Sequence, residues 1–255
     1  MPSQPTEASQ RTAARIAGVA FLIIVIGWTL NWILVDSKIV VAGDAGKTIA
    51  NVRAEELLFR LGLANELIFA VCGIVLGFAL CTLLEQVNRN LALLALNLKL
   101  AEATLAASLV LAAFLSLQML DGSASPLEES LGRFLTVRST GSAITMAFLG
   151  LDSILFFSLL FKSRYVPRAL SGLGVFAYAL IFIQSFLSLL VSVRGQTAVT
   201  TMSLALFAPS ILFELLAGLW LLIKGVKTGP QPAAPASTRG EFASPPAGLT
   251  PTSPR

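Results

Sequence analysis

The chain has 255 residues, a length that suits one or two soluble domains, but its composition excludes that class of protein. Hydrophobic residues make up 55% of the chain and charged residues 13%, whereas a soluble domain carries roughly 25% charged residues. The 18 basic and 14 acidic residues give a net charge of +4, but the basic side chains flank apolar stretches and form no stripe, which excludes a nucleic-acid partner.

Six apolar stretches are each long enough to cross a bilayer, whose hydrocarbon core requires about 20 predominantly apolar residues per helix. The first, at 16–35, follows two arginines as in a signal peptide, but it is too long for one and is predicted to be an uncleaved anchor. The other five lie at 67–84, 103–120, 141–161, 169–193 and 199–223. We expect the second helix to extend back through Leu57 and the third to Leu91. The predicted fold is all-α: a polytopic membrane protein in which residues 13–224 form a bundle of six transmembrane helices.

Little of the chain lies outside these stretches. Asp44 precedes 45–56 and is a suitable N-cap for a short amphipathic helix on the outer surface. Ser125-Pro126-Leu127-Glu128 has a capping residue, a proline at the first helical position and a glutamate at the third, so the fourth helix is predicted to begin outside the lipid. Residues 1–12 form an N-terminal tail, and the Pro-rich composition of 228–255 predicts a disordered C-terminal tail.

The orientation is predicted from the basic residues next to the apolar stretches. These residues are concentrated in two very short connectors, at 85–90 and 162–168, and near both ends of the chain. We therefore expect a protein of the cell membrane with both termini in the cytoplasm. Trp28 and Trp32 lie near one end of the first stretch, as is typical of an interfacial aromatic belt.

Residue content excludes several chemistries. The chain has no histidine, so it lacks His-ligated haem or zinc and Ser-His or Cys-His nucleophile pairs. Cys72 and Cys81 fall on opposite faces of one helix and are predicted to be inert buried thiols. No metal or cofactor is expected. The glycines of Gly73-Ile-Val-Leu-Gly77 and of Gly172-Leu-Gly174 lie inside apolar helices, where we expect helix-packing faces.

Ionisable residues inside the apolar stretches are the most informative feature. Lys99, Asp152 and Glu214 each lie about 15 Å from the basic flank of their helix, so three helices place a charge in one layer. Glu102 follows Lys99 on an adjoining face. Each such charge costs roughly 2.5–3.5 kcal/mol at a helix centre and must face the bundle interior. We call Lys99, Glu102, Asp152 and Glu214 the inner cluster; Pro209 is expected to kink the last helix just before Glu214.

A second polar group is predicted at the opposite mouth of the bundle. Glu56 and Arg60 are four residues apart in the favourable order. Asn65 and Glu66 lie just below them, and Arg138 enters from the fourth helix at a similar depth. We call Arg60, Asn65, Glu66 and Arg138 the outer cluster.

The inner cluster has two principal interpretations. Lys99 pairs with Asp152 or with Glu214 in an ion pair that fixes helix register, or the cluster lines a functional pocket or pathway. Three acids share the layer with one base, so at least one carboxyl group is expected to hold a proton. An intramembrane enzyme using Asp152 and Glu214 as a converging carboxylate pair is the weakest alternative.

Several segments resemble a known family. Gly43-Asp44-Ala45, Leu58-Phe59-Arg60-Leu61-Gly62 and the run 88–94, followed by Lys99 and Glu102, resemble the bacterial membrane family called domain of unknown function 4386. That family often has arginine at the position of Lys99 and a histidine in its later helices, and this chain has neither. The resemblance covers about residues 11–224 and implies a six-helix bundle, but it implies no activity.

The sequence therefore predicts an integral membrane protein of unknown biochemical activity. The favoured hypothesis is a non-enzymatic structural or regulatory helix bundle with an inward-facing charge cluster. The alternative is a proton- or cation-coupled transporter of a small solute that uses the intramembrane carboxylates. The expected partners are the lipid bilayer and a second copy or another membrane protein.

Overall fold

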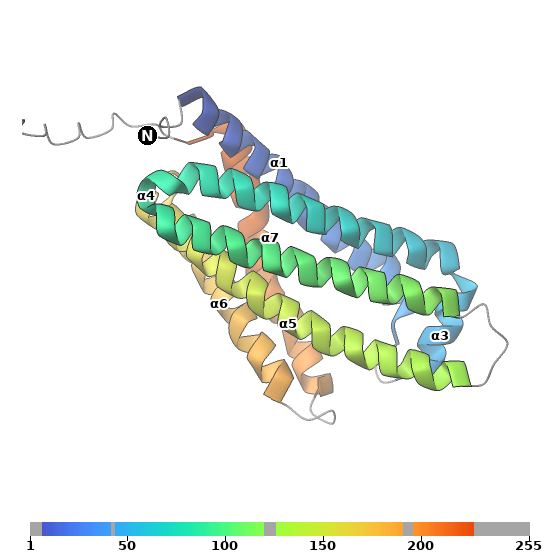
Figure 1. Cartoon of the computed structure of the whole chain (residues 1–255). Helices are drawn as coiled ribbons and strands as arrows, with labels where there is room; N and C mark the ends of the chain where they lie inside the picture. The colour runs from blue at the N-terminus through green and yellow to red at the C-terminus, as the bar shows by residue number, and fades with distance from the viewer. Residues whose placement is uncertain (1–6, 42–43, 120–125, 191–195, 227–255) are drawn as a thin grey trace, which may run out of the picture.

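The computed structural model describes residues 7–41, 44–119, 126–190 and 196–226, and within these ranges it is helical, without strands (Figure 1). The predicted all-α class is therefore confirmed for the described residues. The predicted tail at 228–255 lies outside them. Helix α1 (Glu7–Asn31) begins within the predicted N-terminal tail and continues through the π-helical turn η1 (Trp32–Asp36) into α2 (Ser37–Ile39).

The short helix α3 (Ala45–Ala54) occupies the position of the predicted amphipathic helix. The side chain of Asp44 caps it by accepting a hydrogen bond from the backbone N–H of Lys47 at 2.9 Å. Val52 of α3 is buried with Ile39 and Leu117, in a small core separate from the main one. Helix α3 thus packs on one end of the bundle through this apolar contact.

Helix α4 (Glu56–Met119) contains two of the predicted apolar helices, joined at a sharp turn. Asn88 leaves the helical conformation (φ −160°, ψ 101°), and its side-chain oxygen accepts a hydrogen bond from the backbone N–H of Leu91 at 3.0 Å, which caps the following helix. A straight helix of this length would extend about 95 Å, some three times the thickness of a bilayer core. We call residues 56–87 the first arm and residues 89–119 the second arm.

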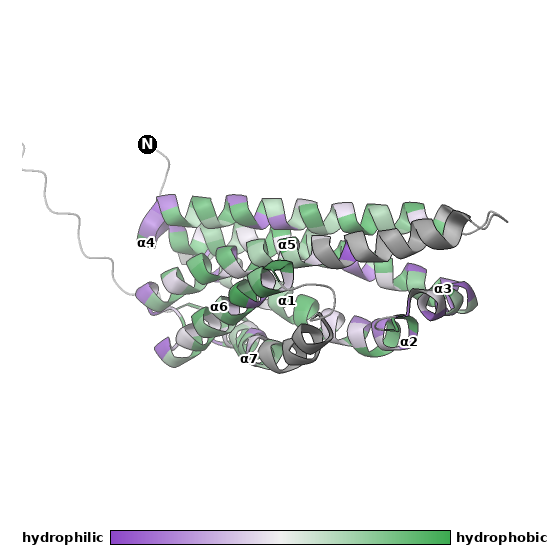
Figure 2. Ribbon diagram, turned by 90° about the horizontal axis from the view of Figure 1, so that it is seen from below, coloured by the Kyte–Doolittle hydropathy of each residue, from purple (hydrophilic) through white to green (hydrophobic). Residues whose placement is uncertain are grey.

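The remaining helices are α5 (Pro126–Ser163), α6 (Arg168–Leu190) and α7 (Gln196–Ile223). Helix α5 begins at the predicted proline. By length and composition, four of the described stretches are suited to crossing a membrane, namely Ala8–Ile39, Glu56–Leu117, Gly141–Ser163 and Arg168–Leu190, and Phe207–Ile223 is a shorter apolar helix. Large apolar side chains cover the outside of the helices, whereas hydrophilic residues gather at the helix ends (Figure 2). Several long apolar helices of this kind indicate a multi-pass membrane protein.

The long helices form a closed ring in which α1 contacts α4, α4 contacts α5, α5 contacts α6, α6 contacts α7, and α7 returns to α1. Near the α4 turn the ring is filled by a tight apolar core. The rings of Phe157 and Phe213 lie 4.4 Å apart there, with Phe21 beside both. Away from the turn the helices spread apart (Figure 1). The core therefore fills one half of the bundle and leaves the other half open at its centre.

One predicted glycine face is a site of close packing. A Cβ atom added at Gly174 of α6 would lie 2.6 Å from the ring of Phe213 on α7, which is closer than carbon atoms pack. The glycine allows the two helices to approach, as expected for small residues between membrane helices.

Candidate functional site

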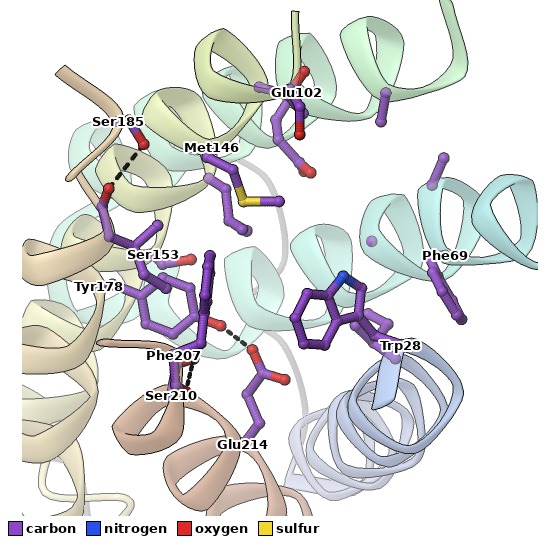
Figure 3. A pocket seen from close by; sticks show the side chains of 18 of the residues that line it. Trp28, Phe69, Glu102, Met146, Ser153, Tyr178, Ser185, Phe207, Ser210 and Glu214 are labelled. Atoms are coloured by element: carbon purple, nitrogen blue, oxygen red, sulfur yellow. Dashed lines mark hydrogen bonds between the residues drawn. The ribbon is translucent and has the colours of Figure 1, made fainter. Parts of the chain in front are cut away.

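A central cavity of about 810 Å³ occupies the open half of the bundle. Its wall is formed by side chains of α1, η1, both arms of α4, α5, α6 and α7. Apolar and aromatic residues such as Trp28, Phe69 and Phe207 make up most of the wall (Figure 3). The charged residues that line it lie toward its two ends. Members of both predicted clusters line this one cavity.

At the end nearest the core, Lys99 joins two carboxylates. Its Nζ atom lies 3.2 Å from Oδ1 of Asp152 and 3.2 Å from Oε2 of Glu102. The hydroxyl of Ser153 donates to the same Asp152 oxygen at 2.9 Å. The Asp152 side chain is 0% exposed, whereas that of Glu102 is 16% exposed and lines the cavity. Lys99 therefore links a fully buried carboxylate to one that faces the cavity.

Two glycines of the first arm make room for the side chain of Lys99. A Cβ atom at Gly77 would lie 2.9 Å from Cγ of Lys99, and one at Gly73 would lie 3.9 Å from its Cδ. The predicted packing face at Gly73 and Gly77 therefore packs against Lys99 of the same chain. Because glycine has no side chain, the aliphatic part of Lys99 can cross between the two arms of α4 and reach Asp152.

Glu214 has a different partner. Its Oε1 atom accepts a hydrogen bond from the hydroxyl of Tyr178 on α6 (Figure 3). Among the described residues, no basic side chain lies within 4.0 Å of Glu214. The sequence left open whether Lys99 pairs with Asp152 or with Glu214. In the structure Lys99 pairs with Asp152. Asp152 and Glu214 are held by separate partners, which offers no support for a converging carboxylate pair.

The outer cluster is only partly brought together. Arg138 Nη2 lies 2.5 Å from Oε1 of Glu66, and both residues line the cavity. Asn65 instead donates to Oδ1 of Asn31 at 3.3 Å and to the carbonyl of Gly27 at 3.2 Å. It therefore joins the first arm to α1 behind the cavity wall.

Arg60 does not belong to this cluster. Its Nε atom lies 2.6 Å from Oε1 of Glu56, in an ion pair whose side chains are 40% and 46% exposed, and its guanidinium stacks 5.7 Å from the ring centre of Phe114. The expectation that it joins Glu66 and Arg138 is wrong because the pairing with Glu56, one turn earlier, turns Arg60 away from the cavity.

Polar residues that the sequence analysis did not single out also line the cavity. Asn31 donates to Asp36 at 3.4 Å across η1, and both lie at the end occupied by Glu66 and Arg138. Tyr178 and Gln184 lie on the inward face of α6. The signal for α6 was present in the sequence, because Ser171, Tyr178 and Ser185 recur every seven residues and so lie on one helix face.

Trp28 is placed differently from the expected aromatic belt. It lines the central cavity, and its ring centre lies 5.6 Å from that of Phe207 on α7. Trp32, one turn later, is 40% exposed on the outside of the bundle. Trp32 lies in the π-helical turn η1, so only Trp28, which is partly buried, packs at the cavity, and Trp32 faces outward.

The thiols and acids of the described residues do not converge on a metal site, since no group of three such side chains has a suitable arrangement. Both cysteines are free thiols. Cys81 is buried, as predicted, but Cys72 is only half-buried.

The cavity can accommodate a small molecule that has both polar and apolar parts. Arg138 and Asp152 are about 21 Å apart along α5, at about 1.5 Å per residue, so the two polar ends are well separated. Between them the wall is largely apolar. Binding sites for small molecules have this combination of an apolar wall and a few placed polar groups.

Residues 16–225 match the family described as domain of unknown function (DUF4386). Comparisons with curated proteins and with solved structures found no match. The family match spans nearly the whole described chain and includes every member of both clusters. The chain therefore belongs to the family called domain of unknown function 4386.

Proposed function

We propose that this chain is a non-enzymatic protein of the cell membrane that binds a small solute in the central cavity. The observation that carries this proposal is a cavity of about 810 Å³ that is lined by side chains of every long helix and has charged groups toward both ends. This volume lies within the range of about 300–1,000 Å³ that is typical of small-molecule sites.

The proposed topology has six membrane crossings, formed by α1, the two arms of α4, α5, α6 and α7, with both termini in the cytoplasm. The start of α1, the α4 turn and the end of α7 lie at the same end of the bundle (Figure 1). Basic residues at this end stack on aromatic rings, with Lys224 4.4 Å from the ring centre of Trp220 and Arg168 5.6 Å from that of Phe161. Basic and aromatic residues together are typical of the cytoplasmic interface.

The Lys99–Asp152 pair has a structural role in this proposal. It connects the second arm of α4 to α5 in a fully buried position and so fixes the register of two cavity walls. Lipid surrounds the bundle, and a second copy or another membrane protein remains a proposed partner.

Two phenylalanine substitutions on α5 test whether the cavity binds solutes. Ala143 lines the cavity, whereas the neighbouring Ile144 is 40% exposed on the outside. The full chain in phosphatidylcholine nanodiscs is titrated with three tritiated probes that share one carbon skeleton: 3-phenylpropylammonium, 3-phenylpropanamide and 3-phenylpropanoate. We expect at least one probe to bind the wild type and the Ile144→Phe variant, and to lose binding in the Ala143→Phe variant because phenylalanine fills the cavity. Equal binding of all three probes to the two variants contradicts the proposal.

Glu214 supports a second candidate, proton- or cation-coupled transport of a small solute. Its carboxyl group faces the cavity and, within the described part of the chain, has a tyrosine hydroxyl as partner instead of a base. Such a carboxyl group is suited to exchanging a proton or cation. In proteoliposomes, transport predicts a pH-dependent flux of a bound probe that Glu214→Gln abolishes and the exposed Glu55→Gln preserves. Flux that is independent of pH and equal in both variants excludes this candidate.

A further inference from the structure

We propose that the core end of the central cavity binds an organic cation, a protonated amine or quaternary ammonium with an apolar body, through Glu214 and the aromatic rings around it. This inference rests on the proposed solute-binding function and names the class of its ligand.

The side chains at this end leave one carboxyl group, that of Glu214, without a basic partner among the described residues. Glu102 and Asp152 share the ammonium group of Lys99, each at 3.2 Å. Glu214 receives only the neutral hydroxyl of Tyr178. Three acids therefore face one base, and within the described residues no second base lies close enough to pair with Glu214. In a setting of low polarity, such an imbalance favours a positively charged ligand.

The geometry leaves Glu214 available to a ligand. One carboxylate oxygen is occupied by Tyr178, and the other is directed away from Tyr178, toward the side where Trp28 lies (Figure 3). The residue lines the cavity. A ligand ammonium group can therefore approach the free oxygen without displacing the tyrosine, which holds the carboxylate in place.

Aromatic side chains lie near this position, namely Trp28, Tyr178 and Phe207 (Figure 3). Trp28 and Phe207 line the cavity with ring centres 5.6 Å apart, and Phe157 lies 5.2 Å from Tyr178. Aromatic faces attract cations placed within about 6 Å, and cages of such rings recognise ammonium groups. The carboxylate and the rings thus favour the same kind of ligand.

An anionic ligand fits this end poorly. Lys99 is its one basic side chain among the described residues, and two carboxylates already neutralise it. An anion at this end would lie close to Glu102 and Glu214, and among the described residues it would find no unpaired basic side chain there to attract it. The largely apolar wall beyond this layer suits a hydrocarbon or aromatic body attached to the cationic group.

The three probes with a common skeleton test the ligand class. In phosphatidylcholine nanodiscs we expect the wild type to bind 3-phenylpropylammonium at least about tenfold more tightly than 3-phenylpropanamide. Glu214→Gln should reduce this ratio to about one, because it removes the charge and retains the size of the side chain. The exposed Glu55→Gln is the matched control and should leave the ratio unchanged.

A second pair of variants keeps the test decisive if Glu214→Gln fails to fold. Trp28→Leu should weaken the binding of the ammonium probe several-fold more than that of the amide probe, whereas Trp32→Leu, on the exposed side of η1, should affect neither. Equal affinities of the wild type for the ammonium and amide probes overturn the inference, as does tighter binding of the propanoate. If those probes still lose binding in Ala143→Phe, the solute-binding function stands and only the ligand class is wrong. If no probe responds to Ala143→Phe, the proposed function itself fails.

Discussion

The buried triad of Lys99, Asp152 and Glu102 allows a quantitative test of how the bundle is held together. Lys99→Met leaves Asp152 fully buried with Ser153 as its remaining partner, because the lysine contact at 3.2 Å is lost. Removing one member of a buried ion pair costs about 3–5 kcal/mol, and we expect this variant to lie near the upper limit. Asp152→Asn should lie near about 3 kcal/mol, since Glu102 remains 3.2 Å from the ammonium group.

The double variant Lys99→Met/Asp152→Asn separates a charge effect from a packing effect. Because it leaves no unpaired charge between these two positions, we expect it to be less destabilised than the sum of the single variants by at least about 1 kcal/mol. The free energy of unfolding is measured by denaturant titration in mild detergent. The exposed Glu56–Arg60 pair provides the matched control, in which Arg60→Met should cost about 0–1 kcal/mol. Additive single variants, or Lys99→Met no more destabilised than Arg60→Met, would refute the assignment of a buried ion pair.

Three further substitutions test local features. Gly77→Ala places a Cβ atom 2.9 Å from Cγ of Lys99 and should destabilise the fold by about 1–3 kcal/mol, with Gly77→Leu worse, as measured by the same unfolding titration. Asn88→Ala removes the cap of the second arm and should cost about 1 kcal/mol, whereas Asn88→Asp retains an acceptor and should cost less. The backbone N–H of Lys47 holds the pKa of Asp44 below its ordinary value of 3.8. The stabilisation of α3 by this carboxylate is therefore complete above pH 3.8 and is lost as the pH falls through the lower folded pKa. The protection of the Lys47 amide against hydrogen exchange, expressed relative to its intrinsic exchange rate at each pH, should therefore decrease in acid. Asp44→Asn should abolish this pH dependence of the protection, and an unchanged protection factor of the wild-type Lys47 amide across this pH range would contradict the prediction.

Local features of the helices could be predicted because they depend on neighbouring residues. Asp44 and Pro126 mark the starts of α3 and α5 through capping and through the fixed φ angle of proline. The connector at 85–90 could be located from its polarity, and the structure places the turn at Asn88 within it. The depth of Lys99 and Asp152 followed from the constant rise of a helix.

Which side chains pair could not be predicted in the same way. Lys99 had two possible acidic partners at one depth, and the choice of Asp152 depends on how the second arm of α4 is rotated against α5. The local pair of Glu56 and Arg60, expected from their spacing, forms, but Arg60 does not join Glu66 and Arg138, which pair with each other. Sequence spacing gives depth and helix face, but contacts between helices depend on rotation, tilt and the residues that separate them.

The sequence by itself determined that the chain is built of long apolar helices and that its few internal charges face inward. A charged side chain that faces lipid costs too much free energy, which explains why the charges face inward. The helices could be recognised because helical periodicity depends only on neighbouring residues. Only the tertiary structure decided that these charges border a cavity, that Trp28 points into it, and that Glu214 is held by Tyr178 and not by Lys99. These features depend on a bundle that is closely packed at the α4 turn and spread apart at the other end, which is a property of all the helices together.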